Sequence, residues 1–235
     1  MRPETDYAGR AIQGQREDQE DCHAFADLDD GRLLAVLADG AGGQASGELA
    51  SRISALGFLD AFTQSREQTA PGLSAALHEA NRRLAEFMAR DRARRMTMAT
   101  TLLAAVVDGR ALYWISVGDS PLLLYRAGSV TQLNADHSGG LNVSGTHSKN
   151  VLRSALVGGR IPLIDWRREP FPLQEGDRVI VASDGLWTLS TEEIAEHLAG
   201  HREEPAADLA RGLLDALVAK GKANQDNATI VVIKL

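Results

Sequence analysis

The chain has little of several residue types, and each scarcity excludes a class of protein. It holds one cysteine, Cys22, in 235 residues, so no disulfide forms within the chain, as expected in a reducing cytosol. Basic residues are outnumbered, with a net charge of -7, which argues against broad nucleic-acid binding. No apolar run approaches the roughly 18 residues of a membrane span, and the first residues lack the apolar core of a secretory signal. We therefore expect a cytoplasmic protein without a membrane segment.

What is present indicates a folded domain. Hydrophobic residues make up 44% of the chain, enough for one large domain or two small ones, and no linker or fixed-period repeat divides it. We expect a single domain, 1–235. Apolar runs predict strands at 33–38, 100–107, 111–117, 122–125, 177–183 and 228–233, after an extended polar segment. Helical spacing predicts helices over about 49–62, from Pro71 to about 90, from Thr191, and over 205–219. This order favours a segregated α+β fold.

Two segments stand apart from this regular pattern. Residues 134–159 are polar and contain glycine, with few apolar anchors apart from 151–156, and so long a stretch is often functional. Residues 90–95 are rich in arginine. This basic run is either the solvated end of a helix or a docking patch for an acidic partner.

Two aspartate-glycine pairs each close a buried apolar run: Asp39-Gly40 and Asp184-Gly185. A hydrophobic strand delivers the carboxylate to its end, and the glycine lets the chain turn away. Taken singly, such a pair is usually only a turn. As a set they predict carboxylates gathered at one rim of a sheet.

Two further aspartates, Asp119 and Asp226, follow similar signals. Carboxylates that lie so close together would not all stay ionised without a cation. Oxygen-only ligands favour Mg²⁺ or Mn²⁺, and the lack of cysteine or histidine clusters disfavours zinc.

Arg16, Glu20 and Asp21 form a second candidate group. In a regular strand Arg16 and Glu20 would share a face while Asp21 would point the other way, so a bulge or turn is needed to bring all three to one site. Arginine offers the planar fork that grips a phosphate. The alternative interpretation is a surface salt bridge.

Six segments, in order, resemble a known family. They are Gly14-x-Arg16-x-x-x-Glu20-Asp21-Cys22-His23, Ala38-Asp39-Gly40-Ala41-Gly42-Gly43, Thr100-Thr101, Gly118-Asp119-Ser120, Ser183-Asp184-Gly185-Leu186-Trp187 and Asp226-Asn227-Ala228-Thr229. This set resembles the PP2C (PPM) metal-dependent protein serine/threonine phosphatases, in particular bacterial stand-alone catalytic domains. The resemblance covers nearly the whole chain.

The resemblance implies a four-layer α-β-β-α sandwich, with two central antiparallel sheets flanked by helices. It also implies two Mn²⁺ or Mg²⁺ ions at one end of that sandwich, with a possible third, and a flap over about 138–160. Carried over position by position, the resemblance implies that Asp39 bridges both metals, that the Gly40 carbonyl binds one of them, and that Asp184 and Asp226 bind the other. Glu20 and Asp21 would contact a metal directly or through its waters, and Asp119 would share a third metal site with Asp184. Arg16 would bind the substrate phosphate.

The implied activity is hydrolysis of phosphoserine and phosphothreonine in proteins by a water bridging two metal ions. No phospho-enzyme is needed, and a Cys-x5-Arg loop is absent because residue 28 is Leu28. Animal-type members carry histidine where Ala41 stands, so the acid for the leaving group is open. His137, His147 and a metal-bound water are the candidates.

Two other functions compete with an active protein phosphatase. One is a pseudophosphatase that binds a phosphoprotein or kinase without turnover; the other is a phosphatase of small phosphorylated metabolites. The expected partners are phosphorylated proteins and a cognate serine/threonine kinase, with no nucleic acid and no membrane, and the chain is expected to be a monomer.

Overall fold

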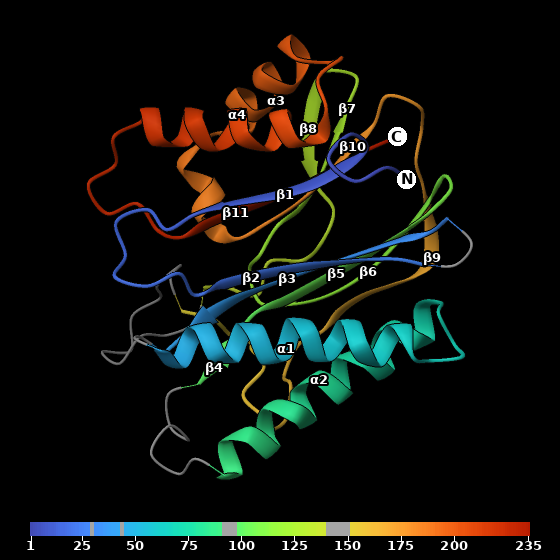
Figure 1. Cartoon of the computed structure of the whole chain (residues 1–235), viewed down its shortest axis with the longest axis vertical. Coiled ribbons are helices and arrows are strands. Elements are labelled where there is room, and N and C mark those ends of the chain that lie inside the picture. The colour runs from blue at the N-terminus through green and yellow to red at the C-terminus, as the bar shows by residue number, and fades with distance from the viewer. Residues whose placement is uncertain (29–30, 43–44, 91–97, 140–150) are drawn as a thin grey trace.

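A computed structural model describes residues 1–28, 31–42, 45–90, 98–139 and 151–235. Two antiparallel sheets lie face to face, and a pair of helices covers the outer face of each (Figure 1). The layers run α-β-β-α, which confirms the predicted fold class. None of the described helices is long and apolar enough to cross a membrane.

The first sheet has five strands in the order β1-β11-β10-β7-β8. Their bounds are β1 Tyr7–Ile12, β11 Ala228–Lys234, β10 Arg178–Ala182, β7 Leu122–Arg126 and β8 Ser129–Gln132. Helices α3 (Thr191–Gly200) and α4 (Ala206–Ala219) cover its outer face (Figure 1). A capping box starts α3, because the Ser190 hydroxyl accepts from the Glu193 N–H while the Glu193 carboxylate accepts from the Ser190 N–H.

The second sheet has the strand order β2-β3-β5-β6-β9, with β4 paired to the end of β3. The bounds are β2 Asp21–Asp27, β3 Leu33–Ala41, β4 Ala99–Thr100, β5 Leu102–Asp108, β6 Ala111–Val117 and β9 Asp165–Pro172. Helices α1 (Ala45–Thr63) and α2 (Ala70–Arg90) cover its outer face. Pro71 lies in the first turn of α2, where its missing N–H costs no hydrogen bond.

The strand β3 shows why the sequence carries solid apolar runs. Leu33, Ala35 and Leu37 pack in the core between the two sheets, while Leu34 and Val36 pack against the helices. A strand buried on both faces needs apolar residues at every position. Such a strand can therefore place a carboxylate only at its end, where burial stops.

The strands of the structure differ from the predicted ones in several places. The predicted strand 100–107 is interrupted at Thr101, which separates β4 from β5. The strand 165–172 was not predicted, because most of its residues are exposed at the edge of the second sheet and give no apolar pattern. The predicted strand 177–183 is shorter by one residue at each end.

Candidate active site

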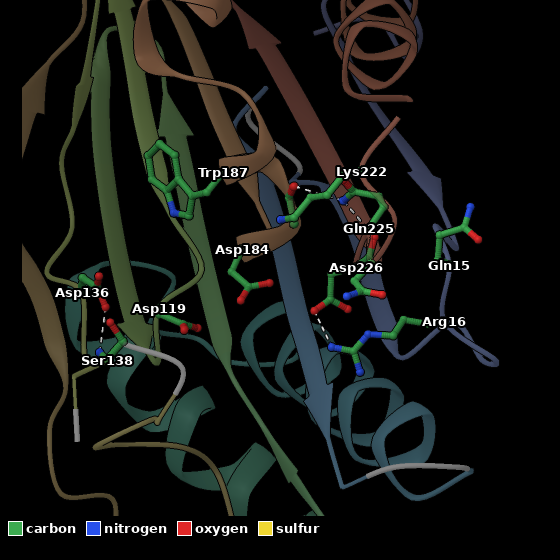
Figure 2. Close-up of a pocket in the computed structure, with 12 residues that line it drawn as sticks. Gln15, Arg16, Asp119, Asp136, Ser138, Asp184, Trp187, Lys222, Gln225 and Asp226 are labelled. Atoms are coloured by element: carbon green, nitrogen blue, oxygen red, sulfur yellow. Dashed lines mark hydrogen bonds and ion pairs between the residues drawn. The ribbon is translucent and has the colours of Figure 1, made fainter. Parts of the chain in front are cut away.

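The described carboxylates of the predicted site gather at one end of the sandwich. They line a hollow of about 830 Å³ and a smaller adjoining pocket of about 280 Å³. Both cavities share four lining residues, namely Arg16, Asp119, Asp184 and Asp226, so they form one continuous depression (Figure 2).

Asp39 lines the smaller pocket and lies two residues before the end of β3. It is paired in register with Asp21 of β2. The Asp39 N–H donates to the Thr101 hydroxyl over 2.9 Å, and the Thr101 N–H donates to the Asp39 carbonyl over 2.8 Å. The interruption of the sheet at Thr101 therefore serves to hold Asp39 by its backbone.

Asp184 enters the depression in a different way. It begins a short 3-10 helix, η1 (Asp184–Thr188), directly after β10. Gly185 makes this turn possible, because a Cβ there would lie 2.0 Å from the Asn227 carbonyl oxygen. The close packing of two backbone segments leaves the Asp184 side chain facing the larger hollow (Figure 2).

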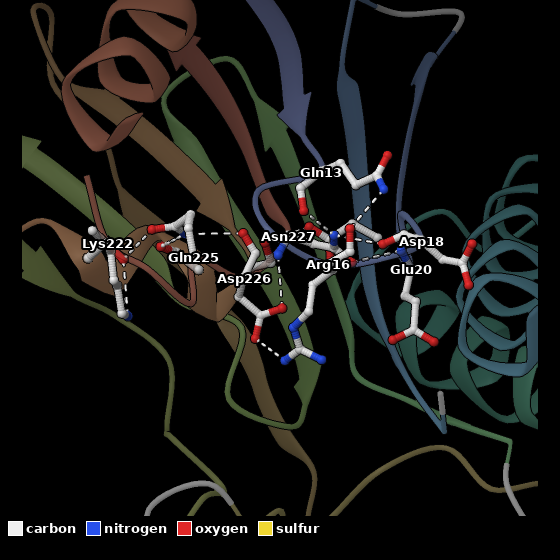
Figure 3. Close-up of polar contacts among 12 residues, drawn as sticks. Gln13, Arg16, Asp18, Glu20, Lys222, Gln225, Asp226 and Asn227 are labelled. Atoms are coloured by element: carbon white, nitrogen blue, oxygen red, sulfur yellow. Dashed lines mark hydrogen bonds and ion pairs between the residues drawn. The ribbon is translucent and has the colours of Figure 1, made fainter. Parts of the chain in front are cut away.

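The Asn227 side chain connects three points of the loop before β2 (Figure 3). Its Nδ2 donates to the carbonyls of Gln13 and Asp18 over 2.8 and 2.9 Å, and its Oδ1 accepts from the Glu20 N–H over 2.9 Å. Arg16 and Glu20 thus lie in a loop, and Asp21 begins the strand. This loop is the departure from a regular strand that the sequence predicts if the three residues are to serve one site.

Arg16 forms an ion pair with Asp226 at the rim, with Nη2 and Oδ2 2.5 Å apart (Figure 3). The pair raises the pKa of Arg16, first through the hydrogen bond to Asp226. Because the Arg16 side chain is 55% exposed, the pair contributes little to stability. Arg16 therefore forms a surface salt bridge and also lines the pocket, so both interpretations of it hold.

The carboxylates disfavour one another's ionisation. Burial, followed by repulsion from Asp21 and Asp184, raises the pKa of Asp39 well above its ordinary value. Burial also raises the pKa of Asp21 to about 6 and that of Asp119 to about 6. The pKa of Asp184 is raised by burial and then by Asp226. Ionising the whole set requires compensating positive charge.

The donor set fits hard divalent cations. The buried Oε1 of Glu20 and Oδ1 of Asp21 have no hydrogen-bond partner in the described structure. A cation would satisfy such oxygens, and all the side-chain donors are carboxylates. Across the described ranges, no three acidic, histidine or cysteine side chains already converge as ligands around one point. The carboxylates line the depression as separate donors. The ion pair of Asp226 is with Arg16.

The structure brings the predicted site residues together. Seven of them line the two cavities: Arg16, Glu20, Asp39, Gly40, Asp119, Asp184 and Asp226. Asp21 lines neither cavity, but its Oδ2 accepts from the Ser183 hydroxyl over 2.7 Å beside them. Ser183 and Asn227 have no predicted role. The signal for them is that each adjoins a predicted metal ligand within one of the six segments that resemble the family.

Of the two histidines proposed as the leaving-group acid, the structure describes only His137. His137 is buried and lines neither cavity; its Nδ1 accepts from the Gly118 N–H over 3.2 Å, and burial lowers its pKa. It therefore braces the turn before Asp119. His147 lies outside the described residues, as do residues 140–150 of the expected flap and 91–97, which include most of the basic run.

The fold and the site together define a class: an α-β-β-α sandwich with a carboxylate-lined depression and an arginine at one end of its sheets. Residues 8–228 match the family model described as protein phosphatase 2C. The chain belongs to the PP2C family.

Individual relatives agree with this assignment. The serine/threonine protein phosphatase PstP of Mycobacterium tuberculosis is 31% identical over 240 residues, covering 96% of this chain and 44% of PstP. The chain thus spans less than half the length of that curated relative. The crystal structure of the PstP catalytic domain in complex with two manganese ions matches with a TM-score of 0.78 and 28% identity, over 97% of this chain and 96% of that one. The S. agalactiae serine/threonine phosphatase, 24% identical, shares the fold with a TM-score of 0.83, over 98% of this chain and 99% of the other.

Proposed function

We propose that this chain hydrolyses phosphoserine and phosphothreonine in proteins and that the reaction depends on Mn²⁺ or Mg²⁺. The observation that carries the proposal is the depression that Asp39, Asp184 and Asp226 line together with Arg16. The family match over residues 8–228 and the relatives named as serine/threonine phosphatases support it.

Two metal ions would be held by the acidic residues at the ends of β3, β10 and β11. The proposed ligands are Asp39 as the bridge, the Gly40 carbonyl, Asp184 and Asp226, with Glu20 and Asp21 contributing directly or through water and Asp119 joining Asp184 for a third ion. When bound, such ions lower the pKa of the attacking water and offset charge on the phosphoryl oxygens. The unpartnered oxygens of Glu20 and Asp21 support this assignment.

The chain's own residues then bind and orient the substrate. Arg16 exchanges its contact with Asp226 for the substrate phosphate, to which its guanidinium donates two parallel hydrogen bonds. Asn227 fixes the loop that carries Arg16, and Thr101 fixes the backbone of Asp39. Ala41, which lines the smaller pocket, supplies no proton to the leaving group.

The decisive experiment is hydrolysis of a phosphoserine peptide with Mn²⁺, with Mg²⁺ and with a chelator. We expect turnover with either ion and none with the chelator. Binding of the phosphopeptide without turnover at saturating Mn²⁺ would instead favour the pseudophosphatase. The presence of an acidic residue at each proposed metal-binding side chain argues against that alternative. A higher kcat/KM on small phosphorylated metabolites than on phosphopeptides would favour the metabolite phosphatase.

The finer properties of the protein complete the proposal. We propose a cytoplasmic monomer, a cognate serine/threonine kinase as the source of its substrates, and a flap over about 138–160 that contacts protein substrates. Leu152, on the described part of this segment, lines the smaller pocket and supports a role beside the site. Deleting 141–150 should lower kcat/KM on a phosphoprotein more than on a small aryl phosphate. Equal losses on the two substrates would count against the flap.

A further inference from the structure

The larger hollow has one wall that takes no part in the smaller pocket. Trp187 of η1 and Lys222, Asn224 and Gln225, between α4 and β11, form this side wall (Figure 2). These four residues include no carboxylate; Asp136, beside Ser138, also lines the larger hollow alone, and the part shared by both cavities carries three aspartates. The hollow therefore has an acidic part at the reaction site and a part of different chemistry beside it.

Lys222 has hydrogen-bonding capacity to spare. Its ammonium donates one long hydrogen bond, 3.3 Å, to the Thr188 hydroxyl, and it forms no ion pair within the described part of the chain. An ammonium group has three donors, so others are available to a ligand. In Figure 2 the Lys222 side chain extends toward η1, the turn that carries Asp184 and Trp187. The neighbouring Lys220, by contrast, is paired with Glu193 and lines neither cavity.

Trp187 is the most exposed of the three tryptophans, at 41%. The indole N–H of Trp114 donates to Asp165 and that of Trp166 donates to the Ala70 carbonyl, so both are anchored in the fold. Trp187 instead presents its ring to the hollow (Figure 2). An exposed aromatic ring beside a polar site is typical of a binding surface.

The side wall is held in a fixed position relative to the reaction site. The Thr188 hydroxyl donates to the Gln225 Oε1 over 2.7 Å, which joins η1 to the segment before β11. The Gln225 Nε2 in turn donates to the carbonyl of Asp226 over 3.1 Å. A ligand that contacts Lys222 and Trp187 is thereby placed at a set distance from Arg16.

We propose that the side wall is a specificity subsite for a peptide segment that flanks the phosphorylated residue and carries an acidic side chain. The proposal rests on the proposed phosphatase function. With the phosphate held at Arg16, the flanking chain enters the larger hollow, because the two cavities are continuous. There the Lys222 ammonium pairs with the acidic side chain, and the Trp187 ring packs against the peptide.

Two phosphoserine peptides that differ only in flanking aspartates or asparagines test the subsite. With Mn²⁺ present, wild-type protein should prefer the aspartate peptide by about fivefold in kcat/KM, as for a partly exposed charge pair. Lys222→Met should remove this preference, and Lys222→Glu should reverse it. Lys220→Met is the matched control and should retain the wild-type preference.

The outcomes separate the subsite from the function on which it rests. Equal kcat/KM on both peptides by wild-type protein, or an unchanged preference in Lys222→Met, overturns the subsite while turnover itself upholds the phosphatase. If neither peptide is hydrolysed, the proposed phosphatase function is rejected. The subsite is then tested by titrating the tryptophan fluorescence of the protein with the dephosphorylated aspartate and asparagine peptides. Tighter binding of the aspartate peptide, with a signal lost in Trp187→Phe, supports it; equal binding or no change overturns it.

Discussion

The two aspartate-glycine pairs have the same sequence and different structures. Asp39-Gly40 continues a strand, and Asp39, held by backbone bonds to Thr101, lines the smaller pocket. Asp184-Gly185 opens a 3-10 turn, and Asp184 lines both cavities. The difference teaches that one dipeptide can supply a fixed central carboxylate or a rim carboxylate, depending on whether the strand continues.

The largest effect should come from the central carboxylate. Asp39→Asn should lower kcat/KM on a phosphopeptide by about 10³-fold or more, because it removes the proposed bridge on which charge stabilisation depends. The metal-free protein should keep its Tm, since a charge is removed from among like charges. Asp108→Asn, at the exposed last residue of β5, is the control. Wild-type turnover in Asp39→Asn would make the assignment of that residue wrong.

The rim carboxylate should matter less. Asp184→Asn should lower kcat/KM by about 10²-fold, and more Mn²⁺ should recover part of the loss, because the other proposed ligands remain. The measurement is the Mn²⁺ concentration for half-maximal activity. A loss as deep as that of Asp39→Asn, with no change in the metal requirement, would break the distinction between centre and rim.

The glycines should be equally intolerant of a side chain. A Cβ would lie 2.1 Å from the Gly47 carbonyl oxygen at Gly40 and 2.0 Å from that of Asn227 at Gly185. Each alanine variant should lower the free energy of unfolding by about 1–3 kcal/mol in urea titrations. Gly200→Ala, at the end of α3 with nothing within 4 Å, is the control and should be neutral or slightly stabilising. A wild-type free energy of unfolding at either position would show that the backbone contact there is not required.

The smallest effect should be a pH dependence of the metal-free protein. The pKa values of Asp21 and Asp119, both about 6, lie above the unfolded value of 3.8. The folded state therefore binds more protons between these values, and stability falls as pH rises from about 4 to about 6. This loss of stability is seen as a falling Tm. Added Mn²⁺ should cancel the fall above pH 6. A Tm that rises with pH in chelator would contradict the burial and repulsion that raise these pKa values.

Much of this picture could be predicted from the sequence, because the strands that carry the site are buried on both faces. Their solid apolar runs mark β3 and β10, and the aspartates mark where burial ends. The exposed edge strand β9 leaves no such mark.

The supporting side chains could not be predicted, because their partners are distant along the chain. Asn227 contacts Gln13 and Asp18, and Ser183 contacts Asp21. No local pattern reports a contact between residues so far apart. The Thr101 interruption likewise follows from its bond to Asp39 rather than from any weakness in the apolar run.

The pairing of β1 with β11 has a consequence for when the site can exist. The Arg16–Asp226 contact joins residues 210 positions apart, and Asn227 orders the loop that carries Arg16. Contacts of such long range form late and slowly in folding. During synthesis, a chain that still lacks residues 226–234 has neither Asp226 nor the Asn227 side chain that bonds to the loop carrying Arg16. The order of the elements therefore predicts that the site is complete only after β11 has left the ribosome.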